Sequence, residues 1–552
     1  MGWNQILCLL CFHFFLHSSL RFALPLCPLD QRDALLHFKN SFVLDSKASD
    51  PCQWHFVDSY YQKINPIKSY PKINSWHMGT DCCSWDGVAC DDATGNIIGL
   101  DLTCSWLHGT LHSNSSLFRL HHLCSLNLFG NNFVGSHISS NLSAFATLTH
   151  LNLSSSSFSG FVPSEISHLS KLVSLDLSNN YFFDTHSFPY LGLENSIFTM
   201  LVQNLTTLRK LVLDKVNMSM VSPKSFANLS SSLTYLSVCQ CSLGGIFPDT
   251  VFRLPSLTSL YIGENYNLYW ILPKSNWTSP LETLSLYGTS FSGEIPNSIG
   301  NMKNLTILDL EDCKFTGHIP SSMWNLSQLQ VLWIDENSFS GVVEFKLFTK
   351  LKNLRMLYVS QELNLIYDTL EYTFPKLEVL SLFSCNLTKF PFFLNSLKRL
   401  TQLDLSSNGI SGEIPMWFWG ISYDTLELLN LFDNLLEGGI QLLHWKKLSS
   451  IYLRKNSFHG PLPILPPSTY YFDVSYNNFT GEIPSLICQF SPLPSPVTYY
   501  YSIASNNITG KIPSLICNAT QLEIIDLSNN SLTGSLPQCL TNFSTDLSVL
   551  NL

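Results

Sequence analysis

The sequence lacks the features that mark several broad classes of protein. No run of lysine or arginine exceeds two residues and the formal net charge is −10, which argues against a nucleic acid or an anionic membrane surface as partner. Beyond the N-terminal segment no apolar run reaches the roughly 18 residues of a membrane-spanning helix. The motifs of P-loop proteins, α/β-hydrolases, zinc proteases and kinases are absent, and the 16 histidines are scattered. We therefore expect no enzymatic activity, no cofactor and no metal.

A leucine-rich pattern occupies most of the chain instead. Its clearest copy, residues 522–537, reads LEIIDLSNNSLTGSLP, and about 19 copies run from about Gly99 to Leu552, mostly about 21 to 26 residues apart. One such repeat cannot bury its apolar face alone, so the copies must stack into one continuous core. The L-x-L alternation makes a short strand with its leucines inward. The pattern predicts an α/β leucine-rich repeat solenoid whose parallel strands line a concave face.

Each repeat also carries a turn residue and, in many copies, a G-x-[IL]-P segment. Asparagine follows the strand at most of these turns, and we expect its amide to bond to the backbone of adjoining turns. Cys241, Cys313 and Cys385 replace this asparagine, where a lone buried thiol is expected. The spacing lengthens near residues 185–199 and 491–496, and the segment 45–72 is also long, which predicts three inserted loops.

The N-terminal part divides into a leader and a cap. Residues 1–24 contain the apolar stretch ILCLLCFHFFL and are typical of a secretory signal peptide, so we expect the protein to be extracellular. Residues 27–98 precede the repeats, which fill residues 99–552. Within the cap, residues 30–42 have apolar side chains at helical spacing, with Gln31 among the residues expected to face outward. Such a helix would cover the open end of the first repeat.

The sequence has 16 cysteines, two of them in the leader, and an oxidising compartment favours disulfides. Cys104 follows the strand of the first repeat, whereas Cys124 precedes the strand of the second, roughly 15 Å away along the sheet. A disulfide requires Cα atoms within about 7 Å. We therefore predict that Cys104 pairs with Cys52 in the cap. A cysteine-rich metal site in the cap is the alternative interpretation, although no histidine stands at ligand spacing.

Many N-x-[ST] sequons agree with a secreted protein. Those predicted to be glycosylated are Asn114, Asn141, Asn204, Asn228, Asn276, Asn304, Asn325, Asn478, Asn507, Asn518 and Asn542.

The most specific local motif is CCSWDGVACD, residues 82–91. Together with residues 100–118 and 161–172 it resembles plant receptor-like proteins of the Cf and Ve type, over nearly the whole chain. The resemblance implies the disulfides Cys27–Cys82 and Cys83–Cys90, and Trp85 packed beneath the cap helix. It also implies that the G-x-[IL]-P segments add a second strand and twist the solenoid, as in the plant-specific extracellular subclass with its disulfide-bonded cap.

Members of that family are cell-surface immune receptors with extracellular repeats, one transmembrane helix and no kinase, so they depend on adaptor and coreceptor kinases. This sequence is similar to their N-terminal, ligand-sensing part. It ends inside its nineteenth repeat, with no C-terminal cap, transmembrane or kinase segment, so we expect frayed final repeats and a truncated or decoy form. A receptor ectodomain that binds a secreted protein or peptide elicitor is the main hypothesis. A soluble protein resembling plant polygalacturonase inhibitors is the alternative.

The outward positions of the strands in repeats seven to eleven are the candidate binding surface. Aromatic residues supply anchors for a partner and acidic residues steer its approach, although a merely solvated face is the other interpretation. The candidate residues are Tyr261, Glu264, Tyr287, Asp309, Glu311, Asp312, Trp333, Asp335, Glu336 and Tyr358. Further along, Tyr452, Arg454 and Lys455 reverse the charge and form a second candidate contact.

Overall fold

The computed structural model describes residues 26–52, 67–180, 191–275, 277–360, 363–367, 372–484, 499–518, 522–541 and 547–552. The predicted signal peptide lies outside these residues. The chain has two compact units, Met1–Leu257 and Thr258–Leu552. Each unit is a stack of leucine-rich repeats, which confirms the predicted fold class.

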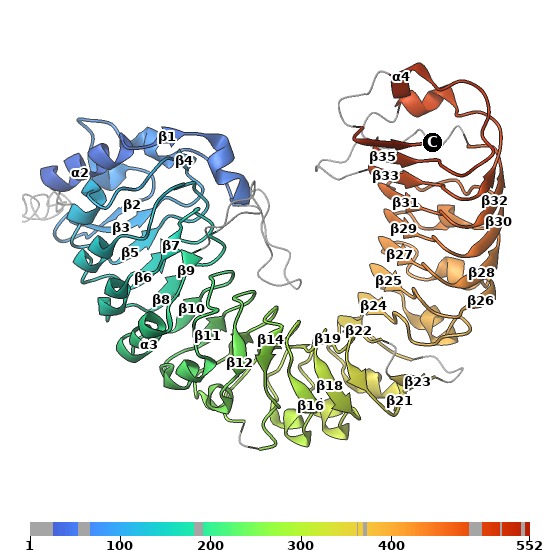
Figure 1. Ribbon diagram of the computed structural model, residues 1–552, viewed down its shortest axis with the longest axis horizontal. Helices are drawn as coiled ribbons and strands as arrows, with labels where there is room; N and C mark the ends of the chain where they lie inside the picture. Colours follow the sequence, from blue (N-terminus) through green and yellow to red (C-terminus); the bar gives the residue numbers. More distant parts are fainter. Residues whose placement is uncertain are drawn as a thin grey trace, which may run out of the picture. The chain divides into compact units, whose positions relative to one another are not determined.

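In the first unit the cap joins a parallel sheet of repeat strands (Figure 1). Strand β2 runs antiparallel to β3, and the strands after β3 are parallel to it. The strands are β2 (Val88–Cys90), β3 (Ile97–Asp101), β5 (Ser125–Asn127), β6 (His150–Asn152), β8 (Ser174–Asp176), β10 (Lys210–Val212) and β11 (Tyr235–Ser237). Shorter strands of this unit are β1 (Val43–Leu44), β4 (Leu107–His108), β7 (Gly160–Phe161), β9 (Leu191–Gly192) and β12 (Gly244–Ile246).

The cap helix α2 (Leu29–Lys39) ends three residues before the predicted boundary. Its apolar side buries Leu35 and Phe38, as the helical spacing predicts. Gln31 is an exception to the expected outward face, because its side chain is 6% exposed. The amide of Gln31 donates to Asn96 and accepts from the backbone N–H of Ile97 at 2.8 Å. This glutamine fastens the helix to the edge of the first repeat strand.

In the second unit one parallel sheet continues through the described repeat strands, which pair in register except for one shift between Tyr499 and Tyr500. The strands are β13 (Ser259–Tyr261), β15 (Thr283–Ser285), β17 (Ile307–Asp309), β19 (Val331–Trp333), β22 (Met356–Tyr358), β24 (Val379–Ser381), β25 (Gln402–Asp404), β27 (Leu428–Asn430), β29 (Ser450–Tyr452), β31 (Tyr471–Asp473), β33 (Tyr499–Ser502), β35 (Leu522–Asp526) and β36 (Val549–Asn551). The leucine or isoleucine at the middle of each strand from β13 to β29 points into the core and is almost fully buried.

A second row of short strands lies across the repeats from this main sheet, as Figure 1 shows for β26 to β32. In several repeats these strands come from the segment that leads to a G-x-[IL]-P motif. They are β14 (Asn267–Tyr269), β16 (Ser292–Glu294), β18 (Lys314–Gly317), β20 (Ser338–Phe339), β21 (Val342–Glu344), β23 (Asn364–Ile366), β26 (Ser411–Glu413), β28 (Leu435–Gly438), β30 (Ser457–Pro461), β32 (Asn478–Gly481) and β34 (Asn507–Ile508). They form the additional strand of the plant-specific repeat that the resemblance implied.

The turn asparagines hold consecutive repeats together. The amide of Asn131 donates to the carbonyls of Leu102 in the preceding repeat and Leu128 in its own, at 2.8 and 2.9 Å. Its carbonyl accepts from the N–H groups of Ser105 and Leu107. Each such amide thus satisfies buried backbone groups that no strand reaches. Where cysteine takes the place of asparagine, the thiol donates to one of the same carbonyls, as Cys313 does to Leu286 at 3.2 Å.

The described residues include only part of the predicted insertions. Of residues 185–199, the described portion is not a loop, because helix α3 (Asn195–Asn204) begins within it and packs against the neighbouring repeats. Phe198 of α3 lies fully buried with its ring 4.6 Å from that of Phe226. Residues 491–496 lie outside the described residues. The remaining described helix is α4 (Gln538–Thr541), and most other repeats have short 3-10 turns at this place.

Candidate functional site

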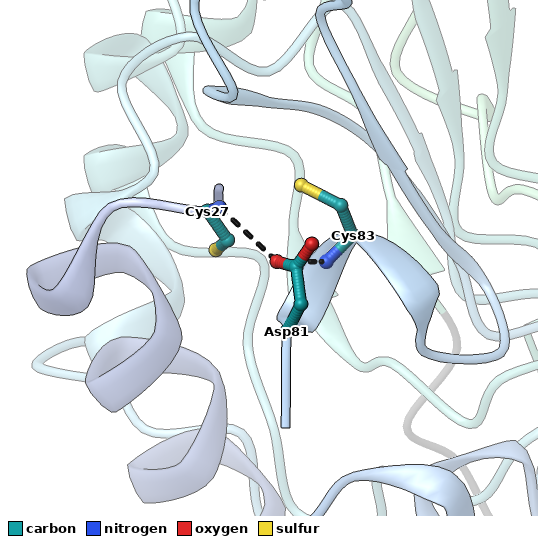
Figure 2. A group of neighbouring side chains, drawn as sticks. All are labelled: Cys27, Asp81 and Cys83. Atoms are coloured by element: carbon teal, nitrogen blue, oxygen red, sulfur yellow. Dashed lines mark hydrogen bonds between the residues drawn. The ribbon is translucent and has the colours of Figure 1, made fainter. Parts of the chain in front are cut away.

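Two features could carry function, and the first is the group of chelating atoms in the cap. Figure 2 shows Cys27, Asp81 and Cys83, whose ligand-type atoms lie within 4.8 Å of one another. Both sulfurs belong to disulfides, Cys27–Cys82 and Cys83–Cys90, so neither is a thiolate that a metal could bind. The carboxylate of Asp81 accepts hydrogen bonds from the N–H groups of Cys27 and Cys83 at 3.1 and 3.2 Å. The group is therefore a capped turn closed by two crosslinks.

The third disulfide ties the long segment of the cap to the first repeat. Cys52 and Cys104 are bonded, with their Cα atoms 6.1 Å apart. Cys124 is a half-buried free thiol. The three bonds join the six cysteines that the sequence analysis paired.

Trp85 is buried in the cap, where a second tryptophan links its ring to the ring of a helix residue. Its ring stacks on Trp76 at 5.6 Å, and Trp76 in turn lies 6.5 Å from Phe38 of α2. The indole N–H of Trp85 donates to Thr80 at 2.7 Å. The resemblance did not include Trp76, whose ring neighbours both Phe38 of the helix and Trp85 of the motif.

The second feature is the predicted surface of strands β13 to β22, all in the second unit. Two side chains of each repeat point to the solvent side of the main sheet there. The first row crosses the strands, with one residue from each. It contains Tyr261, Asp309, Trp333 and Tyr358, and Ser285 occupies the same position on β15, so that all five pair in register. The second row lies two residues further on and contains Tyr287, Glu311 and Asp335. Backbone hydrogen bonds connect the repeats at this row, because the N–H of Gly288 donates to the carbonyl of Glu311 and the N–H of Asp312 donates to the carbonyl of Asp335. We call the residues of these two rows the acidic-aromatic face.

Three residues of this face are more enclosed than the sequence suggested. Asp309, Trp333 and Asp335 are 3%, 5% and 8% exposed. They point away from the leucine core, as predicted, but large neighbours on adjacent strands cover them. The rings of Trp333 and Tyr358 lie 4.8 Å apart and shield each other. Trp333 thus occupies an outward strand position and is nonetheless buried, whereas Tyr287 remains half-exposed.

The other three candidates do not lie on strands. Glu264, Asp312 and Glu336 have φ angles of 52°, 47° and 51°, in the left-handed region. Each precedes the turn residue of its repeat, where the chain leaves the sheet. They form an acidic border beside the acidic-aromatic face.

Burial and mutual repulsion raise the pKa values of two acids of the face, Glu311 and Asp335. Burial, followed by the nearby carboxylates of Asp335 and Asp309, raises the pKa of Glu311 to about 8. Burial also raises the pKa of Asp335 to about 7, with Glu336 and Asp309 adding to it. The hydroxyl of Ser285 donates to Asp309 at 2.7 Å. These shifts are those expected when several carboxyls share a desolvated site.

The sequence analysis missed a ladder of tyrosines on strands β29, β31 and β33. The rings of Tyr452, Tyr471 and Tyr500 stack at 4.3 and 4.5 Å. Only Tyr452 had been singled out. The recurrence of tyrosine at the strand positions 471 and 500 was the available signal. Nearby, Arg454 lies over the ring of Tyr476 at 4.8 Å, and Lys455 pairs with Asp433 at 2.9 Å.

Most predicted glycosylation sites have exposed side chains, which is compatible with modification. The exposed ones are Asn114, Asn141, Asn204, Asn228, Asn304, Asn325, Asn478 and Asn507. The side chains of Asn276, Asn518 and Asn542 lie outside the description.

Comparison with known families gives the class of protein. A leucine rich repeat N-terminal domain matches residues 28–58 and 63–91. Leucine-rich repeat models match residues 147–169, 206–266, 280–302, 304–326, 375–415, 468–490 and 521–543. Among solved structures, the ectodomain of the Arabidopsis receptor kinase HAESA in complex with an extended IDA peptide hormone aligns with a TM-score of 0.55. That alignment has 27% identity and covers 94% of this chain and 89% of that one.

Curated relatives narrow the class. Receptor-like protein 6 of Arabidopsis thaliana is 35% identical over 95% of this chain and 62% of its own length. Receptor-like protein 7 of the same plant is 33% identical over 93% of this chain and 60% of its own. Receptor-like protein Cf-9 of Solanum pimpinellifolium is 39% identical over 54% of this chain and 33% of its own. The chain thus spans about three fifths, or less, of the length of these relatives.

The fold and the cap define an extracellular-type leucine-rich repeat protein. More particularly, the chain belongs to the plant leucine-rich repeat receptor-like proteins. Within the part of the chain that the structure describes, no helix has the length and apolar character needed to cross a bilayer.

Proposed function

We propose that this chain is the ligand-recognition part of a plant cell-surface receptor-like protein, and that it binds a secreted peptide or protein elicitor on its acidic-aromatic face. The observation that carries the proposal is the gathering of aromatic and acidic side chains on consecutive strands β15 to β22. Tyrosine and tryptophan are the residues that most often anchor a partner. A complementary charge steers its approach.

The comparisons support a peptide as the ligand class. The HAESA ectodomain, which shares this architecture, was solved with a peptide hormone, and a second structure of it also contains the co-receptor SERK1. By analogy we propose that the full-length form works with adaptor and coreceptor kinases at the outer face of the plasma membrane. Three disulfides in the cap agree with an oxidising, extracellular setting.

Selection from a displayed library of short linear peptides tests this proposal. The glycosylated chain is used as bait, and the recovered peptides are measured against wild type and Tyr287→Ala. Tyr287 is half-exposed, so its removal should weaken binding by about 2 kcal/mol without unfolding the chain. Tyr269→Ala is the matched control, because Tyr269 is an exposed tyrosine on β14 in the other row of strands. Peptides whose binding ignores Tyr287 but depends on Tyr269 would contradict the proposed face.

A further inference from the structure

Two carboxyls of the acidic-aromatic face lie next to each other on neighbouring repeats. Glu311 and Asp335 occupy the same position of consecutive repeats, and the backbone N–H of Asp312 donates to the carbonyl of Asp335. After burial, the carboxylate of Asp335 makes the largest contribution to the raised pKa of Glu311. Glu311 is half-exposed, whereas Asp335 is 8% exposed, so the pair has one accessible and one enclosed member.

One oxygen of the enclosed member, Asp335, has no donor from the described protein, although a backbone hydrogen bond at Asp335 itself reaches the carboxyl group. Oxygen Oδ1 of Asp335 is shielded from solvent and has no hydrogen-bond partner among the described residues. A buried carboxylate oxygen without a donor costs free energy of about 1 to 3 kcal/mol or more. This oxygen is therefore an acceptor that the described protein leaves open, and a donor from a bound partner would relieve the cost.

Among the described residues, the charged side chains that raise the pKa of Glu311 and Asp335 are all acidic. Glu311 is surrounded by Asp309 and Asp312 of its own repeat and by Asp335 and Glu336 of the next. Asp335 is influenced by Glu336, Asp309 and Asp404, the last from β25. On the flanking strands the titratable neighbours are Tyr287 and Tyr358, which carry no charge at neutral pH. Among the described residues neither Glu311 nor Asp335 has an ion-pair partner.

The geometry favours an organic cation over a metal. Among described residues, the cap group is the one place where three candidate ligand atoms lie within 4.8 Å of one another. The carboxyls of this face are thus spread too widely to chelate a single ion. A guanidinium or ammonium group is larger, presents several donors, and is also attracted to aromatic rings such as the pair Trp333 and Tyr358 beside it.

We infer that Glu311 and Asp335 form a subsite for one cationic side chain, an arginine or a lysine, of the bound peptide. This inference rests on the proposed function and specifies the ligand that the face takes. Glu311 meets the cation at the surface, and Asp335 supplies the second acceptor behind it.

The subsite binds in a pH-dependent manner. Both carboxyls hold a proton more tightly than free side chains do, and a cation binds their ionised form. Binding therefore releases protons, and the affinity for the cation rises about tenfold per pH unit for each proton released, up to the raised pKa values. The affinity should level off above about pH 8.

Thermal unfolding of the whole chain tests the subsite with defined probes. The probes are the peptide Gly-Gly-Arg-Gly-Gly and the same peptide with neutral citrulline in place of arginine, each added in excess at pH values from about 5 to about 9. We expect the arginine peptide to raise the melting temperature more than the citrulline peptide does. The difference should grow with pH, disappear in Glu311→Gln and Asp335→Asn, and persist in Glu437→Gln, which removes an exposed acid on β28.

Three results would overturn the subsite. They are equal effects of the two peptides, an arginine effect that survives both substitutions, and reproduction of the effect by calcium chloride at matched ionic strength. Failure here is distinct from failure of the proposed function. Selected peptides that depend on Tyr287 but show no preference for arginine or lysine leave the face intact and remove the subsite. Asp335→Asn keeps the shape of the side chain, so misfolding should not obscure the reading.

Discussion

At the scale of single residues, side chains on the solvent side of the sheet have to be treated as packed groups. The strands pair in register about 4.8 Å apart, so large side chains on adjacent repeats contact one another. Trp333 is enclosed in this way even though it points away from the leucine core. Alternation of leucines identifies the outward direction, but exposure depends on which residues stand on the neighbouring strands.

Trp333→Ala should therefore destabilise the fold. Loss of a buried tryptophan ring leaves a cavity and costs about 3 kcal/mol of unfolding free energy. Tyr287→Ala, at a half-exposed site, should cost much less. Urea unfolding of the two variants beside wild type measures both values. Equal midpoints for Trp333→Ala and wild type would show that Trp333 is not packed as described.

The raised pKa values of Glu311 and Asp335 predict how the stability of the fold depends on pH. In the folded chain the pKa of Glu311 is about 8 and that of Asp335 about 7, against about 4 when unfolded. Between about pH 4 and these values the folded state binds more protons, so the free energy of unfolding falls as the pH rises. Asp335→Asn should raise the melting temperature at about pH 8 and change it little at about pH 4. An identical pH profile for variant and wild type would contradict the shift.

At the scale of elements, the sequence predicted the structure correctly at positions whose role is set within their own repeat. The leucines identified the strands, and the turn asparagines identified the amide ladder. The residues that escaped sequence analysis depend on distant partners. Gln31 turns inward because Asn96 and Ile97 offer it hydrogen bonds. Part of the predicted insertion is helix α3 because the buried ring of Phe198 packs on Phe226 of the next repeat. The electrostatic coupling of Glu311 and Asp335 likewise arises from residues a full repeat apart.

The hydrogen bonds of the turn asparagines predict that substitutions at the turn position lower the free energy of unfolding by unequal amounts. Asn337→Ala removes an amide that donates to Leu310 at 2.7 Å and accepts from Phe315 at 3.0 Å, and leaves both groups buried. We expect a loss of about 2 to 3 kcal/mol. Cys385→Ala removes one weak thiol bond to Val359 and should cost less. Urea unfolding of both variants compares them, and a larger loss for Cys385→Ala would contradict the proposed role of the amide.

At the scale of the whole molecule, stability is a sum over repeats and their neighbours, because each repeat contacts only the adjacent ones. The cap is attached to the first repeats by Cys52–Cys104, by the Gln31 bonds, and by a hydrogen bond from Ser116 to the helix backbone at Ala34. A local defect in the cap should accordingly spread only as far as neighbouring repeats transmit it.

Replacing Cys52 and Cys104 together by serine tests how far a defect in the cap spreads along the repeats. The bond closes a separation of 52 residues, for which the loop-entropy model gives about 4 kcal/mol. Hydrogen exchange followed by mass spectrometry should show strong loss of protection in β3 and β5, progressively weaker loss towards β11, and none in the strands of the second unit. Cys124→Ser, which removes a free thiol near the same repeats, is the matched control and should leave the pattern unchanged. Uniform loss of protection through both units would mean that the chain unfolds as one cooperative body, and that the repeats are coupled far beyond their nearest neighbours.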